Sequence, residues 1–269
     1  MPAIKNVLSN KLNVLLTRPK VKSQELAKTL SELSISSYTQ PLFDYKSTAK
    51  HNEIDLALTN ANIVIFVSVP AVHFTHDSYP LTDKKLKRIQ FFAVGQATKS
   101  ALKALGINNV LSPQTPLLET SEGLLQLPEL GSKASKLVSN KNIVIFRGNG
   151  GREHIAKTLT QRGAQICYIE SYQRIWNNFS QETVKLWKSK KINCIVTTSN
   201  DILKALVTLI QNDDSQLEPF WREQCVWVVA SQRIADNAKK LGLINVVNSH
   251  GASTKKLSDT LAGLHLTQR

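Results

Sequence analysis

The residues Ala-Lys-Thr-Leu occur twice in this chain, at 27–30 and at 156–159, a separation of 129 positions. In both copies an arginine, Arg18 or Arg147, lies nine residues upstream at the end of an apolar run. At the same offset Asn13 corresponds to Asn142, and each is followed by three aliphatic residues. The 269 residues are also enough for two domains of ordinary size. The repeat therefore predicts two similar domains.

Apolar, β-branched runs alternate with segments of helical periodicity in both copies. The predicted strands are 12–17, 36–41, 63–67, 91–94 and 109–111 in the first copy, and 142–146, 165–170, 193–197, 226–230 and 245–247 in the second. Three predicted helices are followed by a glycine suited to the left-handed conformation that ends a helix: Gly106, Gly163 and Gly242. This alternation requires crossover connections and a parallel sheet. The predicted fold class is α/β, with a doubly wound parallel sheet in each domain.

The formal net charge of +14 indicates a partner that carries negative charge. Nucleic acid, anionic lipid and a small acidic substrate all satisfy that condition, so charge alone does not choose among them. The lysines are scattered over the outer faces of predicted helices, which favours an ordinary solvated surface for each cluster.

The cysteines and the lengths of the apolar runs indicate in which cellular compartment the protein is located. Cys167, Cys194 and Cys225 lie far apart in apolar runs and have no Cys-x-x-Cys spacing, so we expect buried, reduced thiols rather than disulfides or zinc ligands. The N-terminus has no signal-peptide pattern. The longest apolar stretch, 63–72, is far shorter than the roughly 20 residues that span a bilayer. A cytoplasmic protein without a membrane partner is predicted.

Ligands of open parallel sheets bind beyond the carboxyl ends of the strands. The residues after the predicted strands are small, hydroxylic or arginine, and they include Arg18, Ser68, Thr98, Arg147, Ser199, Ser231 and Arg233. In the segment 147–152, Gly148 and two further glycines allow backbone amides to approach an anion, and Arg147 and Arg152 can bind carboxylate or phosphate. An ordinary strand-to-helix turn is an equally good interpretation of this segment. It has neither the P-loop nor the dinucleotide-binding pattern, so no nucleotide cofactor is expected.

Other catalytic patterns are scarce. The histidines have no metal-ligand spacing, although His73 and His76 could share a helix face, and we expect no metal site. There is no Gly-x-Ser-x-Gly nucleophile motif and no carboxylate pair near a strand end. Tyr172 is either a buried aromatic side chain or a phenol that acts as a proton donor. The residues alone thus predict an anion-binding α/β protein without an evident covalent catalyst.

Seven motifs in this sequence, from residue 15 to residue 257, resemble those of the uroporphyrinogen-III synthase family. They are LLTRP at 15–19, IFVSVPAV at 65–72, AVGQAT at 93–98, FRGNGGRE at 146–153, ESYQR at 170–174, TTS at 197–199 and NSHGASTKKL at 248–257. Each motif is loose by itself, and the resemblance depends on their order and spacing.

This resemblance implies two flavodoxin-like domains that are not divided in tandem. The repeat alone suggests a cut near residue 135. The family pattern implies instead one domain from residues 1–40 plus 176–269, a second from 45–170, and linker strands at 41–44 and 171–175. It also implies that the substrate lies in the cleft between the two domains.

The implied activity is that of a lyase that cyclises hydroxymethylbilane to uroporphyrinogen III, with loss of water, through a spiro intermediate, and with inversion of ring D. Each ring of this linear tetrapyrrole carries an acetate and a propionate, which suits a basic protein. The resemblance implies no cofactor, no nucleic acid, a monomer, and at most a transient contact with hydroxymethylbilane synthase.

The resemblance also assigns residues. Tyr172 matches the tyrosine proposed to assist departure of the substrate hydroxyl. Polar positions of the cleft are matched by Ser68, Thr98, Arg152 and Ser199, and strand-end placement adds Arg18, Arg147, Gly148, Ser231 and Arg233 as substrate-binding candidates. The sequence departs from the family's Gly-x-x-Thr at Ser231 to Ile234, and Pro70 stands where a basic residue can occur.

Two alternatives stay open. The departure at Ser231 suggests a catalytically weak relative that binds a tetrapyrrole or another polyanion. The net charge suggests a nucleic-acid-binding α/β protein, but the basic residues form no single stripe and no motif presents aromatic side chains for base stacking.

Overall fold

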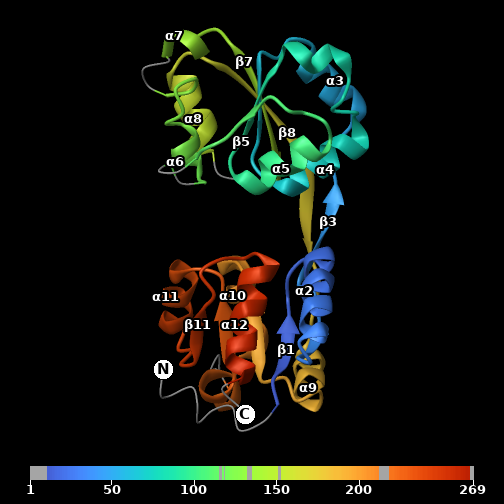
Figure 1. The fold of residues 1–269 in the computed structure, drawn as a ribbon, viewed down its shortest axis with the longest axis vertical. Coiled ribbons are helices and arrows are strands. Elements are labelled where there is room, and N and C mark those ends of the chain that lie inside the picture. The colour runs from blue at the N-terminus through green and yellow to red at the C-terminus, as the bar shows by residue number, and fades with distance from the viewer. Residues whose placement is uncertain are drawn as a thin grey trace. The chain divides into compact units, whose positions relative to one another are not determined.

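The computed structural model describes residues 11–114, 117, 119–131, 135–150, 153–211 and 218–266 (Figure 1). The chain divides into two compact units. Unit 1 comprises residues 1–44 and 175–269 as far as they are described, and unit 2 comprises Tyr45–Arg174. The tandem cut near residue 135 is therefore wrong, because the first strand of the chain pairs with a strand that begins at Cys194.

Unit 1 contains a five-stranded parallel sheet. In spatial order its strands are β11 (Val246–Asn248), β10 (Val226–Val229), β9 (Cys194–Thr197), β1 (Asn13–Leu16) and β2 (Ser36–Thr39). Read from the other edge, this is the flavodoxin-like order 2-1-3-4-5. The three central strands are almost continuously apolar, as expected for parallel strands that are covered on both faces.

Helices cover the sheet of unit 1 (Figure 1). They are α2 (Lys20–Glu32), α9 (Gln181–Ser189), α10 (Asn200–Ile210), α11 (Gln232–Lys240) and α12 (Thr254–Leu266). On one face, Leu26 of α2 and Leu257 of α12 pack with Val14 of β1. Trp187 of α9 and Trp221 are fully buried, and their rings meet edge to face with centroids 6.3 Å apart. These tryptophans are part of the stabilising core of unit 1.

The sheet of unit 2 reproduces this arrangement. Its spatial order is β3 (Phe43–Ser47), β8 (Gln165–Trp176), β7 (Asn142–Gly148), β4 (Ile63–Phe66), β5 (Gln90–Ala93) and β6 (Val110–Leu111). The series β8-β7-β4-β5-β6 corresponds strand by strand to β2-β1-β9-β10-β11, and β7 takes the place of β1. The repeat in the sequence is therefore a repeat of the sheet, and the α/β class is confirmed.

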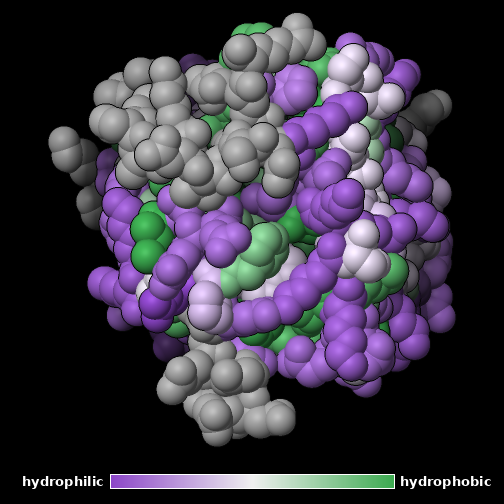
Figure 2. Space-filling view, turned by 90° about the horizontal axis from the view of Figure 1, so that it is seen from below, coloured by the Kyte–Doolittle hydropathy of each residue, from purple (hydrophilic) through white to green (hydrophobic). Residues whose placement is uncertain are grey.

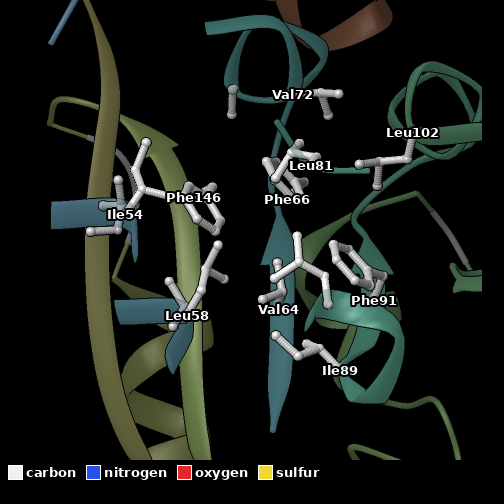
Figure 3. Close-up of a cluster of buried hydrophobic side chains, with 14 of the residues drawn as sticks. Ile54, Leu58, Val64, Phe66, Val72, Leu81, Ile89, Phe91, Leu102 and Phe146 are labelled. Carbon is white, nitrogen blue, oxygen red and sulfur yellow. The ribbon is translucent and has the colours of Figure 1, made fainter. Parts of the chain in front are cut away.

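Unit 2 buries one hydrophobic cluster on each face of its sheet. The helices of one face are α3 (His51–Thr59), α4 (Val69–Ser78) and α5 (Gln96–Ala104), with the 3-10 helix η1 (Lys84–Arg88); those of the other are α6 (Ser121–Leu124), α7 (Ser135–Val138) and α8 (His154–Gln161). Figure 3 shows the first cluster, in which Ile54, Val72 and Leu102 of the helices surround strand residues. Phe66 stacks on Phe146 at 4.7 Å. Tyr172 belongs to the same cluster, so the core of unit 2 also supports a candidate site residue.

The predicted glycine positions at helix ends are confirmed. Gly106, Gly163 and Gly242 have φ values of 86°, 89° and 89°. Side chains larger than hydrogen are strained in this left-handed region, which explains the glycines.

Strand β8 is longer than the sequence predicts. It continues past Glu170 to Trp176, so Tyr172 lies inside the strand and not after it. The extension pairs with β3. Hydrogen bonds flank this pairing at both ends: the Thr48 N–H donates to the Ser171 carbonyl at 3.1 Å, and the Asn177 N–H donates to the Leu42 carbonyl at 2.9 Å. This pairing partner lies more than 100 positions away in the sequence, and no local pattern indicates it.

The prediction that all cysteines are buried is wrong at one position. Cys194 and Cys225 are buried, but Cys167 is exposed. Cys167 lies in the first half of β8, before the residues that β3 pairs with, so this part of the strand runs along the edge of the sheet.

The face of the molecule drawn in Figure 2 is mostly hydrophilic, in keeping with the excess of lysine and arginine. No helix in the described ranges is both long enough and apolar enough to cross a membrane. Among the same residues, no three histidine, cysteine, aspartate or glutamate side chains are grouped as a metal site would require.

Candidate functional site

The candidate residues fall on the carboxyl edges of the two sheets. Neighbouring parallel strands end at the same edge. Unit 1 thus gathers residues after β1, β9 and β10, namely Arg18, Ser199, Ser231 and Arg233. Unit 2 gathers residues at the ends of β4, β5 and β7 and in β8, namely Ser68, Thr98, Arg147, Gly148 and Tyr172. Arg152 lies outside the described residues.

Tyr172 has the most developed surroundings of these residues. Its side chain is 6% exposed, and its hydroxyl lies 3.1 Å from the Ser68 Oγ, where either oxygen can donate. Ser68 is also the N-cap of α4, because its Oγ accepts a hydrogen bond from the Ala71 N–H at 3.3 Å. The start of α4 thereby fixes the partner of the phenol.

Two aromatic rings border Tyr172. Phe74 of α4 stacks with it at a centroid distance of 5.7 Å, and Tyr45 of β3 meets it edge-on at 5.0 Å. Burial raises the pKa of Tyr45, the nearby Tyr172 adds to that rise, and Arg174 opposes it. Neither ring is among the candidate residues predicted from the sequence. Phe74 could have been found, because it lies less than two helical turns after Ser68, whereas nothing local indicates Tyr45.

Gly148 lies directly against the phenol. The strand register pairs it with Tyr172, and a Cβ atom at Gly148 would lie 2.6 Å from Cζ and 2.9 Å from the hydroxyl oxygen. The absence of a side chain at this position is what makes room for the ring. Space for the ring of Tyr172 thus explains why residue 148 is glycine, without any role in anion binding. The contact of Gly148 with substrate stays a prediction.

Arg147 is 7% exposed and lies across the ring of Tyr168, with its guanidinium carbon 4.6 Å from the ring centroid. Its Nε donates to the Gly148 carbonyl at 3.2 Å. The glycine-rich segment that follows has Gly150 at φ 67°, and α8 begins at His154. Residues 151 and 152 lie outside the described residues, so anion binding by this loop also stays a prediction.

The serines of both units cap helices. The Ser199 Oγ accepts from the Ile202 N–H at 3.2 Å at the start of α10, and the Ser231 Oγ accepts from the Ile234 N–H at 3.4 Å at the start of α11. Each arrangement matches that of Ser68. Ser231, where the sequence departs from the expected Gly-x-x-Thr, is therefore the N-cap of α11.

The place of Ser231 in unit 2 is taken by Gly95, the N-cap of α5. There the Gln96 N–H donates to the Glu119 carboxylate at 2.7 Å, and Thr98 is buried in the first turn. A carboxylate at a helix start is stabilised by the helix dipole. The start of α5 therefore already holds a carboxylate of the protein itself, that of Glu119.

Arg18 is the counterpart of Arg147 and is likewise 7% exposed. Its Nη2 donates to the Ala252 carbonyl at 2.7 Å, and its buried Nη1 has no hydrogen-bond partner among the described residues. Burial lowers the pKa of Arg18, and the negative charge of Glu25 opposes that shift. Arg18 thus ties the end of β1 to the segment before α12, whereas Arg233 is exposed in the first turn of α11.

Comparison with known proteins identifies the family. Residues 24–259 match the family model described as "Uroporphyrinogen-III synthase HemD". The uroporphyrinogen-III synthase of Escherichia coli K12 is 32% identical over 236 residues, which cover 86% of this chain and 92% of that protein. The corresponding protein of Salmonella typhimurium is 30% identical with the same coverage.

Solved structures agree in fold. A mutant uroporphyrinogen III synthase of Thermus thermophilus superposes with a TM-score of 0.62 at 12% identity, and covers 96% of this chain and 100% of its own. The uroporphyrinogen-III synthetase of Helicobacter pylori has a TM-score of 0.60 at 14% identity, with 94% and 99% coverage. With these matches spanning most of its length, the chain belongs to the uroporphyrinogen-III synthase family.

Proposed function

We propose that this chain acts as a uroporphyrinogen-III synthase, a lyase of tetrapyrrole biosynthesis that cyclises hydroxymethylbilane with loss of water and inversion of ring D. The observation that carries the proposal is the buried phenol of Tyr172. This side chain lies in the motif ESYQR, and its hydroxyl is held by Ser68 at the carboxyl edge of the unit 2 sheet.

In the proposed reaction, the electron-rich pyrrole expels the hydroxyl group of the hydroxymethyl carbon, and the Tyr172 hydroxyl donates a proton so that it leaves as water. The substituted carbon of the last pyrrole then attacks the carbon left electron-poor and forms the spiro intermediate. The bond from that substituted carbon to its original methylene bridge next breaks, with the electrons of the neighbouring pyrrole leaving the methylene carbon electron-poor in turn. The unsubstituted α-carbon of the last pyrrole attacks this methylene carbon and closes the macrocycle with ring D inverted. After ring closure a proton leaves the new ring system and restores the phenol. The net change is the loss of one water, and no redox partner is needed.

Tyr172 assists this reaction without being indispensable, because the pyrrole itself drives out the hydroxyl group. The larger task is to hold both ends of a flexible substrate in the geometry that leads to inversion. Hydroxyls and helix starts at Ser68, Thr98, Ser199 and Ser231 are candidates for that task.

The acetate and propionate groups need cationic partners. Arg233 is exposed at a helix start and is free to bind a carboxylate without rearrangement. Arg18 and Arg147 are nearly buried and already donate to carbonyls, so they contribute mainly to the local positive potential. Arg152 is proposed from the sequence alone.

The test is a coupled assay in which hydroxymethylbilane is generated in situ and the product isomers are separated. Unassisted cyclisation gives the isomer without inversion. Predominance of isomer III supports the proposal, and a product mixture identical to that of the protein-free control overturns it. Tight binding of the tetrapyrrole without formation of isomer III is the outcome that favours the second candidate, a binding relative, which the departure at Ser231 motivates.

A cytoplasmic monomer that meets hydroxymethylbilane synthase transiently fits the substrate's chemistry. Because the substrate cyclises unaided to the wrong isomer, a short transfer between the two enzymes preserves it. Gel filtration of the two proteins together and apart examines both the oligomeric state and the contact.

A further inference from the structure

We propose that Gly148 and Phe74 are positioning residues that fix the Tyr172 hydroxyl at the reacting group of the substrate. The inference rests on the proposed function, and it extends that function to two residues that need not touch the substrate.

Glycine is needed at position 148 because a side chain there would collide with the ring of Tyr172. The backbone conformation at this position does not itself require glycine. Its φ is not among the positive values, which occur at Gly106, Gly150, Gly163, Gly242 and Gly251. The repeat supplies a second argument, because the position equivalent to Gly148 in the first copy is Pro19. The strand-to-helix turn of this fold therefore does not itself demand glycine. What distinguishes position 148 is the ring of Tyr172, which occupies the place of its Cβ.

The clearance is smaller than a methyl group. The Cβ of an alanine at position 148 would lie 2.6, 2.7 and 2.9 Å from Cζ, Cε2 and the hydroxyl oxygen, whereas ordinary contacts begin near 3.4 Å. The atoms that must give way are at the reactive end of the ring. A shift of about 0.8 Å is needed, which is of the size that alters rates when a catalytic group is displaced. The same shift would also change the 3.1 Å distance between the Tyr172 hydroxyl and the Ser68 Oγ.

Phe74 acts from the face of the ring. It stacks on Tyr172, while the next residue, Thr75, shares a buried 2.7 Å hydrogen bond with the hydroxyl of Ser171. Adjacent residues of α4 thus hold adjacent residues of β8. Ser68, at the start of the same helix, contacts the hydroxyl group of Tyr172. Helix α4 therefore fixes both the position of the phenol hydroxyl and the orientation of the ring.

The kinetic test is a double-mutant cycle of Gly148→Ala and Tyr172→Phe in the isomer-resolved assay. We expect Gly148→Ala to lower kcat by roughly tenfold, less than the 10²–10⁴-fold typical of a lost general acid because the phenol is displaced and not removed. KM should change little, because alanine keeps the backbone amide at position 148 and every other candidate substrate contact. In the Tyr172→Phe background the same substitution should have almost no further effect on kcat. Phe74→Leu should behave like Gly148→Ala, to a smaller extent. Additive losses in the cycle would overturn the proposal.

A matched control is Gly263→Ala, which places the same methyl group on the exposed face of α12 where nothing lies within 4 Å. This variant should retain wild-type kinetics. If Gly148→Ala also unfolds at a lower urea concentration, kcat per folded molecule still decides the comparison.

A second readout does not depend on activity. Of the five tyrosine rings, carbon-13 labelling and NMR identify Tyr172 as the signal lost in Tyr172→Phe. Gly148→Ala and Phe74→Leu should move this signal, and Gly263→Ala should not. An unmoved signal in Gly148→Ala overturns the positioning role even if the wild-type protein makes no isomer III, so the two proposals fail separately.

Discussion

Ser68 and Ser199 provide a matched pair for measuring what the Tyr172 contact adds to stability. They occupy equivalent positions in the two units, and each caps a helix with an N–H to Oγ distance of 3.3 or 3.2 Å. Among the described residues, Ser68 alone of the two also contacts a phenol. Replacing either serine by alanine therefore removes a helix N-cap. Ser68→Ala also removes the contact with the Tyr172 hydroxyl.

The expected loss can be worked out from these contacts. Loss of an N-cap serine costs about 1 kcal/mol of unfolding free energy. Ser68→Ala in addition leaves the Tyr172 hydroxyl, on a side chain 6% exposed, without a described partner, at a cost of about 1–3 kcal/mol. We predict about 1 kcal/mol for Ser199→Ala and about 2–4 kcal/mol for Ser68→Ala.

Urea unfolding followed by two probes measures both values. All four tryptophans lie at or after position 176, in unit 1, so their fluorescence reports on that unit, whereas circular dichroism reports on both. Ser199→Ala should shift the fluorescence transition. Ser68→Ala should shift the dichroism transition further, and equal losses for the two variants would refute the role assigned to the phenol contact.

Three further predictions concern side chains away from Tyr172. Burial and the 3.0 Å hydrogen bond to Asp55 raise the pKa of Tyr79 from 10.0 to about 12, so its contribution to stability is complete below pH 10 and is lost as the pH rises toward 12. Ultraviolet titration should show this late ionisation, and Asp55→Asn should lower the pKa. A thiol reagent should modify Cys167 in the native protein and the two remaining cysteines after unfolding; fast reaction of all three would contradict the burial. Arg18→Met should lower the urea midpoint of tryptophan fluorescence, because the bond to the Ala252 carbonyl is lost, while an unchanged midpoint would argue against that tie.

The sequence predicts the sheets well, because the evidence for them is local. Apolar strands, helix periods and the three helix-ending glycines are all short-range patterns, and the offset of 129 reveals the repeat. The repeat does not reveal that β1 pairs with β9. Pairing between strands that are far apart in the sequence depends on how their buried faces pack together. The residues of one strand alone do not indicate its partner.

The candidate site is predicted in part for the same reason. The serines at strand ends follow from the topology, although their capping role does not. The surroundings of Tyr172 come from β3, α4 and β7, and the fit of Gly148 to the ring depends on the register of β7 against β8. A shift of one residue would turn the phenol to the other face, so this geometry becomes visible only in three dimensions.

The role of Tyr172 in the reaction is tested most directly by comparing the products of Tyr172→Phe and of the wild-type protein. Both are assayed with freshly generated hydroxymethylbilane, and the product isomers are separated. We expect the wild-type protein to form isomer III. The variant should still form isomer III, at a rate lower by roughly tenfold, which is less than the 10²–10⁴-fold typical of general acid catalysis because the electron-rich pyrrole supplies most of the driving force. Loss of isomer III in a folded variant would contradict this expectation and make Tyr172 an indispensable general acid. A rate equal to that of the wild-type protein would contradict it equally, since the hydroxyl would then have no part in the reaction.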